Sequence, residues 1–267
     1  MVSLPFYQVD AFTSSAFGGN PAAVMPLTEW LPDATLLAIA EENNLAETAF
    51  FVPQRNATGG EDFHLRWFTP VVEMDLCGHA TLASAEIILN HLQKGRDKVA
   101  FHTRSGVLTV TRDGQRLAMD FPTRDSAPAP AAEIPAVAKA LGAEVKDLHR
   151  GWTYLAELAD EDVVRELKPD MGAIAALPLG IIVTARGAKA DFVSRVFLPN
   201  IGIPEDPVTG GAHCMLAPYW SAKFGGRETF YARQVSKRGG ELWLALEGNR
   251  LRMSGHAVLT ITGQFHI

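Results

Sequence analysis

A turn that places an acidic residue and a glycine just ahead of a helix occurs twice in this chain. The clearer copy is EDPVTGGAHC at Glu205–Cys214, and a fainter copy is DLCGHATLA at Asp75–Ala83. A Phe-x-Pro motif precedes each copy, at positions 68–70 and 197–199. Two such turns predict two similar halves with a site between them, and this constrains the fold more than any other feature.

The spacing of further segments supports a duplication. Strand-like segments follow Gly106 and Gly240, and Arg-Leu pairs begin at Arg116 and Arg250, so that each pair is 134 residues apart. The glycine turns, at positions 78 and 211, are 133 apart, and the Phe-x-Pro motifs are 129 apart. Short hairpin patterns also match by chance, but an offset shared by two motifs favours an ancient duplication.

The coarse pattern is a mixture of α and β in each half. A helix is predicted from Asp33, which can cap it, to Asn43, and apolar helices are predicted over Ala80–Leu92 and Ala212–Phe224. Pro218 predicts a bend or a lost backbone bond in the last of these. A curved sheet around each apolar helix would bury that helix on all sides, which is an α+β fold. Strands are predicted over 6–10, 22–25, 46–52, 63–68, 98–102, 106–111 and 116–121, and then over 152–158, 180–185, 191–197, 229–235, 241–246 and 250–254.

The domain boundary is predicted from composition. Residues 122–135 hold four prolines and many alanines, which is typical of a linker. Residues 258–263 alternate like a strand that returns to the first half. The sequence therefore predicts one domain from residues 1–121 plus 257–267 and a second from residues 122–256.

Composition argues against several classes of partner. The net charge is −6 and no block of five or more Lys or Arg residues occurs, which disfavours nucleic acid or anionic membrane. The two cysteines, Cys77 and Cys214, form neither a disulfide framework nor a Cys-x-x-Cys pair. The N-terminus has no signal-peptide pattern, and no apolar run is long enough for a membrane span. We expect a cytoplasmic enzyme with a small-molecule partner.

Glu47 is the first candidate for chemistry. On a strand it shares one face with Leu45, Ala49 and Phe51, so the carboxylate should lose hydration and its pKa should rise. Such a shift suits a general acid or base near neutral pH. The alternative, a strand start with the carboxylate in water, is favoured by the pattern alone.

The glycine turns are candidates for ligand binding. The first N–H groups of a helix are unpaired, so the turns at Gly78 and at Gly210-Gly211 could hold a carboxylate, or could be plain helix caps. Asp206 could cap those N–H groups or bind a substrate amine or hydroxyl. Asn20, in a Gly-Gly-Asn-Pro loop, could reach a ligand or merely form a turn.

His79 and Cys77 begin the first of these helices. The helix dipole should lower the pKa of His79 and leave a neutral imidazole that donates one hydrogen bond and accepts another, although a lone His is usually structural. The same position makes Cys77 a candidate nucleophile or base. Its match in the second half falls near Pro207, not on a second thiol, and Cys214 lies inside a helix, where a thiol usually packs. Cys77 and His79 lack partners at ligand spacing, so no metal is expected.

Six ordered motifs give the chain a family resemblance. The chain resembles the PhzF family of phenazine-biosynthesis-like isomerases, on VDAFT at 9–13, GNPAAV at 19–24, NLAETAF at 44–50, RWFTP at 66–70, CGHATL at 77–82 and EDPVTG at 205–210. The resemblance implies the diaminopimelate epimerase-like fold, with two pseudo-symmetric halves, each a β-barrel or roll around a central helix, and an active site in the cleft. It also implies a cofactor-free proton-transfer enzyme that is commonly a homodimer. In the founding member the reaction moves a hydrogen within trans-2,3-dihydro-3-hydroxyanthranilate.

The resemblance assigns roles to individual residues. The family's catalytic Glu falls on Glu47, its supporting His on His79 and its cleft Asp on Asp206, which reverses the preference for a solvated Glu47. Gly211 stands where the family often has Ser. Cys77 matches one of the two thiols of related amino-acid epimerases and proline racemases, but the other thiol is absent.

The predicted function is an isomerase that moves a proton on a small carboxylated substrate, resembling a cyclic amino or hydroxy acid, by general acid/base catalysis. Two alternatives stay open. One is a racemase, epimerase or dehydratase based on Cys77, and the other is a non-catalytic small-molecule binding protein of the same fold.

Overall fold

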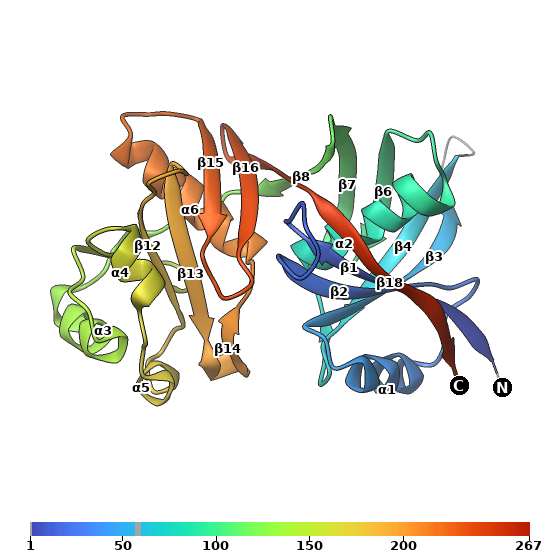
Figure 1. Ribbon diagram of the computed structural model, residues 1–267, viewed down its shortest axis with the longest axis horizontal. Coiled ribbons are helices and arrows are strands. Elements are labelled where there is room, and N and C mark those ends of the chain that lie inside the picture. Colours follow the sequence, from blue (N-terminus) through green and yellow to red (C-terminus); the bar gives the residue numbers. More distant parts are fainter. Residues whose placement is uncertain (1, 57–59) are drawn as a thin grey trace. The chain divides into compact units, whose positions relative to one another are not determined.

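The computed structural model describes residues 2–56 and 60–267. The chain forms two compact units (Figure 1). Unit 1 is Met1–Asp120 with Ser254–Ile267, and unit 2 is Phe121–Met253. Within the described residues, no helix is long and apolar enough to cross a membrane.

Unit 1 is a highly curved set of strands around one helix. Its strands alternate between parallel and antiparallel neighbours: β2 is parallel to β3, β3 antiparallel to β4, β4 parallel to β6, and β6 antiparallel to β7. β1 pairs with both β2 and β18, so the last strand of the chain completes this unit. The elements are β1 (Ser3–Ala11), β2 (Asn20–Pro26), α1 (Asp33–Asn43), β3 (Glu47–Arg55), β4 (Glu61–Phe68), β5 (Glu73–Met74), α2 (Gly78–Ile87), a π-helical turn (Ile88–Leu92), β6 (Lys98–Thr103), β7 (Gly106–Asp113), β8 (Arg116–Pro122) and β18 (Ala257–His266).

Unit 2 repeats this order of pairings. β11 is parallel to β12, β12 antiparallel to β13, β13 parallel to β15, and β15 antiparallel to β16. The repeated alternation supports the duplication inferred from the spacing of the motifs. The elements are β9 (Ala127–Pro128), a 3₁₀ turn (Ala131–Glu133), α3 (Ile134–Leu141), β10 (Asp147–Arg150), β11 (Tyr154–Glu157), α4 (Glu161–Glu166), α5 (Met171–Ala175), β12 (Ile181–Arg186), β13 (Phe192–Leu198), a 3₁₀ turn (Pro199–Ile201), β14 (Ile203–Asp206), α6 (Gly210–Lys223), β15 (Thr229–Gln234), β16 (Gly240–Glu247) and β17 (Arg250–Gly255), whose last two residues belong to unit 1.

The central helix of unit 1 is buried on all sides, as predicted, whereas α6 of unit 2 is buried from Ala212 to Trp220 except at Pro218 and becomes exposed at its C-terminal end. Every residue of α2 after Gly78 is buried, and the helix contacts β1, β2, β3 and β18. Its hydroxyl groups bond to the carbonyls one turn back, Thr81 to Cys77 at 2.6 Å and Ser84 to Ala80 at 2.8 Å. Polar side chains therefore enter this core without leaving a hydroxyl unpaired.

A second layer covers the outer face of the strands in unit 2. Ile181 and Val183 pack with α3, α4 and α5. The alternate residue Thr184 faces α6 instead, where its hydroxyl accepts a hydrogen bond from Trp220 Nε1 at 3.0 Å. Successive side chains of a strand point to opposite faces, and both faces of this strand are covered, so residues 181–185 are all buried.

The linker prediction for residues 122–135 is wrong over most of its length. Ala127–Pro128 pairs with β10, and α3 begins at Ile134 and buries Val137, Ala140 and Leu141. Proline is compatible with the first turn of a helix, where its missing N–H would be unpaired in any case. The proline- and alanine-rich segment 122–135 therefore forms the start of the outer layer of unit 2 and is not a linker.

Two local helix predictions have different outcomes. Asp33 does not cap α1, because its carboxylate bonds to Arg66 Nη1 at 2.9 Å. α6 does continue through Pro218, which cannot donate to the carbonyl of Cys214 four residues earlier. The N–H of Arg124 donates to that carbonyl at 2.9 Å instead, so the lost bond is replaced from a neighbouring segment.

Candidate active site

Glu47 and His79 meet in the interior of unit 1. Glu47 is the first residue of β3, and His79 is the second residue of α2. The Glu47 Oε2 atom lies 3.1 Å from His79 Nε2, and the two side chains are only 11% and 8% exposed. The interpretation of Glu47 as a solvated strand start is therefore wrong.

Cys77 contacts the other edge of the same imidazole ring. Its Sγ lies 3.5 Å from His79 Nδ1. Cys77 is the N-cap residue of α2 and has an extended backbone, which turns its side chain back beside the first helical turn. The ring of His79 is thus held between a thiol and a carboxylate.

This arrangement reverses the predicted direction of the His79 pKa and weakens the case for Cys77 as a nucleophile or base. Burial by itself lowers the pKa of His79, but the neighbouring Cys77 and Glu47 outweigh burial and raise that pKa well above 6.5. Burial, and after it the Glu47 carboxylate, raises the pKa of the Cys77 thiol. A carboxylate in contact is stronger than a helix dipole acting through one turn.

The argument from spacing against a metal site is also wrong in its premise. Glu47, Cys77 and His79 each offer a ligand atom, and these atoms lie within 4.8 Å of one another. Their donor types would suit zinc.

Asn20 and Gly78 lie at the same end of unit 1 as these groups. Asn20 is the first residue of β2, is fully buried, and stands two residues before Ala22, which is opposite Glu47 in the parallel pair. Gly78 is the first residue of α2, directly between Cys77 and His79. The four site residues predicted in the first half therefore all lie where a secondary-structure element begins. Asn20 begins β2, Glu47 begins β3, and Gly78 and His79 begin α2.

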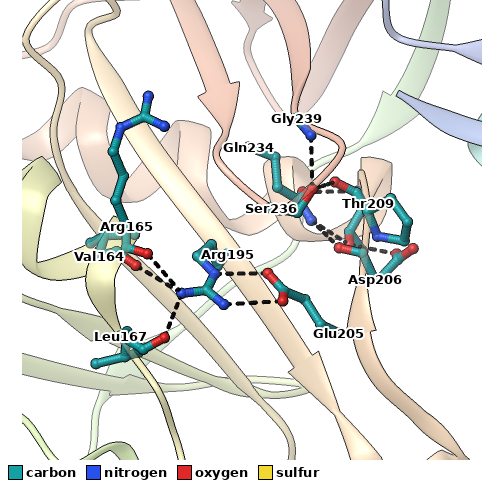
Figure 2. A network of polar contacts seen from close by, with 11 residues as sticks. Val164, Arg165, Leu167, Arg195, Glu205, Asp206, Thr209, Gln234, Ser236 and Gly239 are labelled. Atoms are coloured by element: carbon teal, nitrogen blue, oxygen red, sulfur yellow. Dashed lines mark hydrogen bonds and ion pairs between the residues drawn. The ribbon is translucent and has the colours of Figure 1, made fainter. Parts of the chain in front are cut away.

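Asp206, at the end of β14, belongs to a polar network in unit 2 (Figure 2). Thr209 Oγ1 donates to Asp206 Oδ2 at 2.6 Å. The Gln234 side chain donates to the carbonyl of Asp206 at 2.7 Å and accepts from the N–H of Thr209 at 2.8 Å. Asp206 is therefore held through its neighbours in the turn, so that its carboxylate has a fixed direction.

Gly210 and Gly211 are the first residues of α6, and Thr209 is its N-cap. A Cβ atom added to Gly211 would meet nothing within 4 Å, and one added to Gly210 would meet only Met253, at 3.5 Å or more. Neither glycine has a positive φ. The backbone thus does not demand glycine at 211, and there is room for a serine side chain.

The other polar residues of this helix lie deeper. His213 is fully buried, its Nδ1 lies 2.9 Å from the carbonyl of Thr209, and burial lowers its pKa to about 4. Burial raises the pKa of Cys214 to about 11, in keeping with a packing role. Both side chains lie on α6 and are buried in unit 2.

Sequence reasoning missed an ion pair that leads into each turn. The Arg66 guanidinium donates two hydrogen bonds to the Glu73 carboxylate, at 2.7 and 2.8 Å. The Arg195 guanidinium donates two to the Glu205 carboxylate in the same way, at 2.7 and 3.0 Å (Figure 2). Each pair ties a short strand, β5 or β14, to its neighbour. The signal was available, because each Arg lies two residues before the Phe of a Phe-x-Pro motif.

The acid/base residues of unit 1 have no equivalents in unit 2. Glu47 begins β3, whereas Ile181, 134 residues later, begins β12, and each is paired with a parallel strand. The counterpart of Cys77 is the N-cap residue Thr209 and not a residue near Pro207, and two residues further along each chain segment the counterpart of His79 is Gly211. The two units are alike in topology and different in chemistry.

A chain built of two such units has the diaminopimelate epimerase-like fold. A hydroxyproline epimerase from Agrobacterium vitis shares this fold, with a TM-score of 0.58 at 10% identity over 98% of this chain and 92% of that one. At that identity the similarity concerns the fold alone. The fold prediction is confirmed.

More similar proteins define the family. The profile described as PhzC-PhzF, phenazine biosynthesis-like protein, matches residues 9–263. The chain is 46% identical over 267 residues to an uncharacterized isomerase of Pseudomonas aeruginosa, with 100% of each covered. A PhzF-family crystal structure from Enterococcus faecalis is 42% identical, covers 100% of both chains and has a TM-score of 0.94. The chain therefore belongs to the PhzC-PhzF family of phenazine biosynthesis-like proteins.

Proposed function

We propose that this protein is an isomerase that moves a proton on a small carboxylated substrate, resembling a cyclic amino or hydroxy acid, with Glu47 as general acid and base. The observation that carries the proposal is the buried Glu47 carboxylate, 3.1 Å from His79, in one unit only. Similarity to a relative that is named an isomerase supports it.

A single base of this kind can complete an isomerisation by itself. A Glu47 oxygen accepts a proton from a substrate carbon, and the electron pair of that C–H bond moves into an adjacent double bond or carbonyl. The Glu47 carboxylic acid then returns the proton to another carbon, where an electron pair of the conjugated system forms the new C–H bond and leaves the double bond in a new position. No group is gained or lost, and the carboxylate is regenerated.

The neighbouring groups support this cycle. The neighbouring Cys77 and Glu47 raise the pKa of His79, which favours the protonated ring, and a protonated ring can donate a hydrogen bond to Glu47 or to the substrate. We further propose that Asp206 binds a substrate amine or hydroxyl, and that N–H groups at Gly78, Gly210 and Gly211 bind its carboxylate, since a helix N-terminus favours an anion. Asn20 stays a predicted substrate-binding residue.

Two observations count against the alternative based on Cys77. Burial raises the pKa of its thiol, so little thiolate is available as a base or nucleophile. The structural counterpart of Cys77 in unit 2 is Thr209, which leaves a two-thiol mechanism without its second thiol. Cys77 instead contacts His79 Nδ1 and helps to orient the ring.

The test is solvent exchange with the Glu47→Gln variant. Wild-type protein is incubated in D₂O with a panel of cyclic and aliphatic amino and hydroxy acids, and deuterium at carbon is followed by NMR. Glu47→Gln should slow the exchange by about 10²- to 10⁴-fold, the contribution of one positioned acid/base. Unchanged exchange in this variant would show that Glu47 is not the base.

Glu86 offers a matched control. It is equally buried in unit 1, at 9% exposure, and its Oε1 also lies near a histidine, 3.5 Å from His91 Nε2. Glu86→Gln should keep the exchange rate of the wild type. If wild-type protein binds an acid tightly but exchanges none of the panel, the protein is a binding protein rather than an isomerase.

A further inference from the structure

The turn ahead of α6 is held by a side chain that arrives from a different strand. Gln234 is the last residue of β15 and is fully buried. Its Nε2 donates to the Asp206 carbonyl at 2.7 Å and to Thr209 Oγ1 at 3.2 Å, and its Oε1 accepts the N–H of Thr209 at 2.8 Å (Figure 2). The amide group of Gln234 thus forms hydrogen bonds with both ends of the turn Asp206–Thr209, and we call these three bonds the Gln234 clamp.

The Thr209 hydroxyl connects Gln234 to the Asp206 carboxylate. Thr209 Oγ1, which lies beside Gln234 Nε2, donates its proton to Asp206 Oδ2 at 2.6 Å. When Gln234 Nε2 donates to this hydroxyl oxygen, the hydroxyl hydrogen is left to point at the carboxylate. The position of the Gln234 amide therefore determines the orientation of the Asp206 carboxylate.

The equivalent position in unit 1 has a different role. Gln234 pairs with Gly240 at the start of β16, and Thr103 pairs with Gly106 at the start of β7, so Thr103 is its counterpart. The Thr103 hydroxyl bonds within its own hairpin, donating to the carbonyl of Gly106 at 2.8 Å. Unit 1 therefore has this topology without the Gln234 clamp.

A serine bond, by contrast, is common to both units. Ser236 Oγ donates to the Pro207 carbonyl at 2.8 Å, and Ser105 Oγ donates to the Asp75 carbonyl at 2.7 Å. This shared bond suffices to anchor the turn ahead of α2. What Gln234 adds is specific to the turn that carries Asp206.

We propose that Gln234 is a positioning residue, which fixes the turn Asp206–Thr209 so that the Asp206 carboxylate and the first N–H groups of α6 are presented to substrate in one arrangement. This inference rests on the proposed function for the binding role of Asp206. The clamp itself rests only on the contacts of Gln234.

The experiment compares Gln234→Met with Gln234→Glu and with a control of equal structural cost. Gln234→Met keeps the volume and loses all three bonds, whereas Gln234→Glu keeps an acceptor for the N–H of Thr209. Thr184→Val is the control, because it breaks two other buried hydrogen bonds of unit 2, the one from Trp220 Nε1 and the one that the Thr184 hydroxyl donates to the carbonyl of Val193. Three quantities are measured: Tm, the exchange rate of the Thr209 amide by NMR, and KM for the acid that shows solvent exchange.

Both Gln234→Met and Thr184→Val should lower Tm by a similar amount. Only Gln234→Met should speed exchange of the Thr209 amide by about tenfold or more relative to the rest of α6, and raise KM by about tenfold, since one lost anchoring interaction corresponds to roughly that factor. Gln234→Glu should lie between wild type and Gln234→Met in amide exchange, and it provides the comparison if Gln234→Met does not fold.

Two results would overturn the proposal. One is a Gln234→Met protein with the amide exchange and KM of the wild type, and the other is a Thr184→Val protein whose KM rises as much. A wild-type protein that exchanges no acid would defeat the proposed function instead, and the Thr209 amide would still decide whether Gln234 holds the turn.

Discussion

His79 shows how its neighbours shift the pKa of a buried residue. Its folded-state pKa lies above the ordinary 6.5, so its contacts with Cys77 and Glu47 add stability that is fully present below pH 6.5 and is lost as pH rises through the folded pKa. The free energy of unfolding of wild-type protein should therefore fall as pH rises above 6.5.

The variant Glu47→Gln isolates this contribution. In urea denaturation between pH 6 and pH 9, the stability difference between wild type and Glu47→Gln should be largest at pH 6 and should shrink as pH rises. Glu86→Gln, measured in parallel, reports how much of the trend follows any buried glutamate. A difference that grows with pH would mean that His79 is neutral in the folded protein.

At this scale the family resemblance pointed to Glu47 and His79, whereas the residue pattern alone favoured a solvated Glu47 and showed no contact between the two. Strand alternation put Glu47 on an apolar face, and the family resemblance named His79. The contact between them joins β3 to α2 over an intervening hairpin, and periodicity does not report such packing. The helix-dipole argument then gave the wrong direction for the pKa of His79, because it considered one element without its neighbour.

At the scale of elements, α6 tolerates a proline because another segment supplies the missing donor. Replacing a mid-helix proline by alanine ordinarily gains about 3 kcal/mol. For Pro218→Ala we expect a change within about 1 kcal/mol in guanidinium denaturation, because the Cys214 carbonyl already accepts the N–H of Arg124.

A substitution one residue earlier gives the contrast. Ala217 is also buried in α6, and Ala217→Pro would remove an ordinary intrahelical bond, at a cost of about 3 kcal/mol or more. If Pro218→Ala stabilised the protein by the full ordinary amount, the bond from Arg124 would not be compensating for the proline.

The sequence predicted the central elements better than the outer ones. The two buried helices and the strands around them carry long apolar runs after a glycine turn, which are strong local signals. The short helices α4 and α5 were missed, although Asp160 and Asp170 cap them through side-chain bonds at 2.9 and 3.0 Å. Helices of one or two turns depend on packing against the sheet more than on their own periodicity.

At the scale of the whole molecule, unit 1 is assembled from both ends of the chain. β18 pairs with β1 from Ser3 to Ala11, and Val2 and Ile267 exchange two backbone hydrogen bonds, at 2.7 and 3.0 Å (Figure 1). Deleting residues 257–267 would leave β1 with an open edge along its whole length.

We therefore expect this deletion to unfold unit 1 and to spare unit 2. Amide NMR spectra should lose the dispersed signals of residues 2–120 and keep those of residues 121–253, and limited proteolysis should cut the first set. A truncated protein that unfolds at the denaturant midpoint of the full chain would contradict this.

The pairing of the first strand with the last also sets an order of events during synthesis. β1 leaves the ribosome first and must wait for almost the entire chain before its partner β18 emerges. Unit 2 is encoded without interruption, so it can fold while the first 120 residues are still incomplete. The half that contains Glu47 and His79 therefore cannot be complete until β18 has been made.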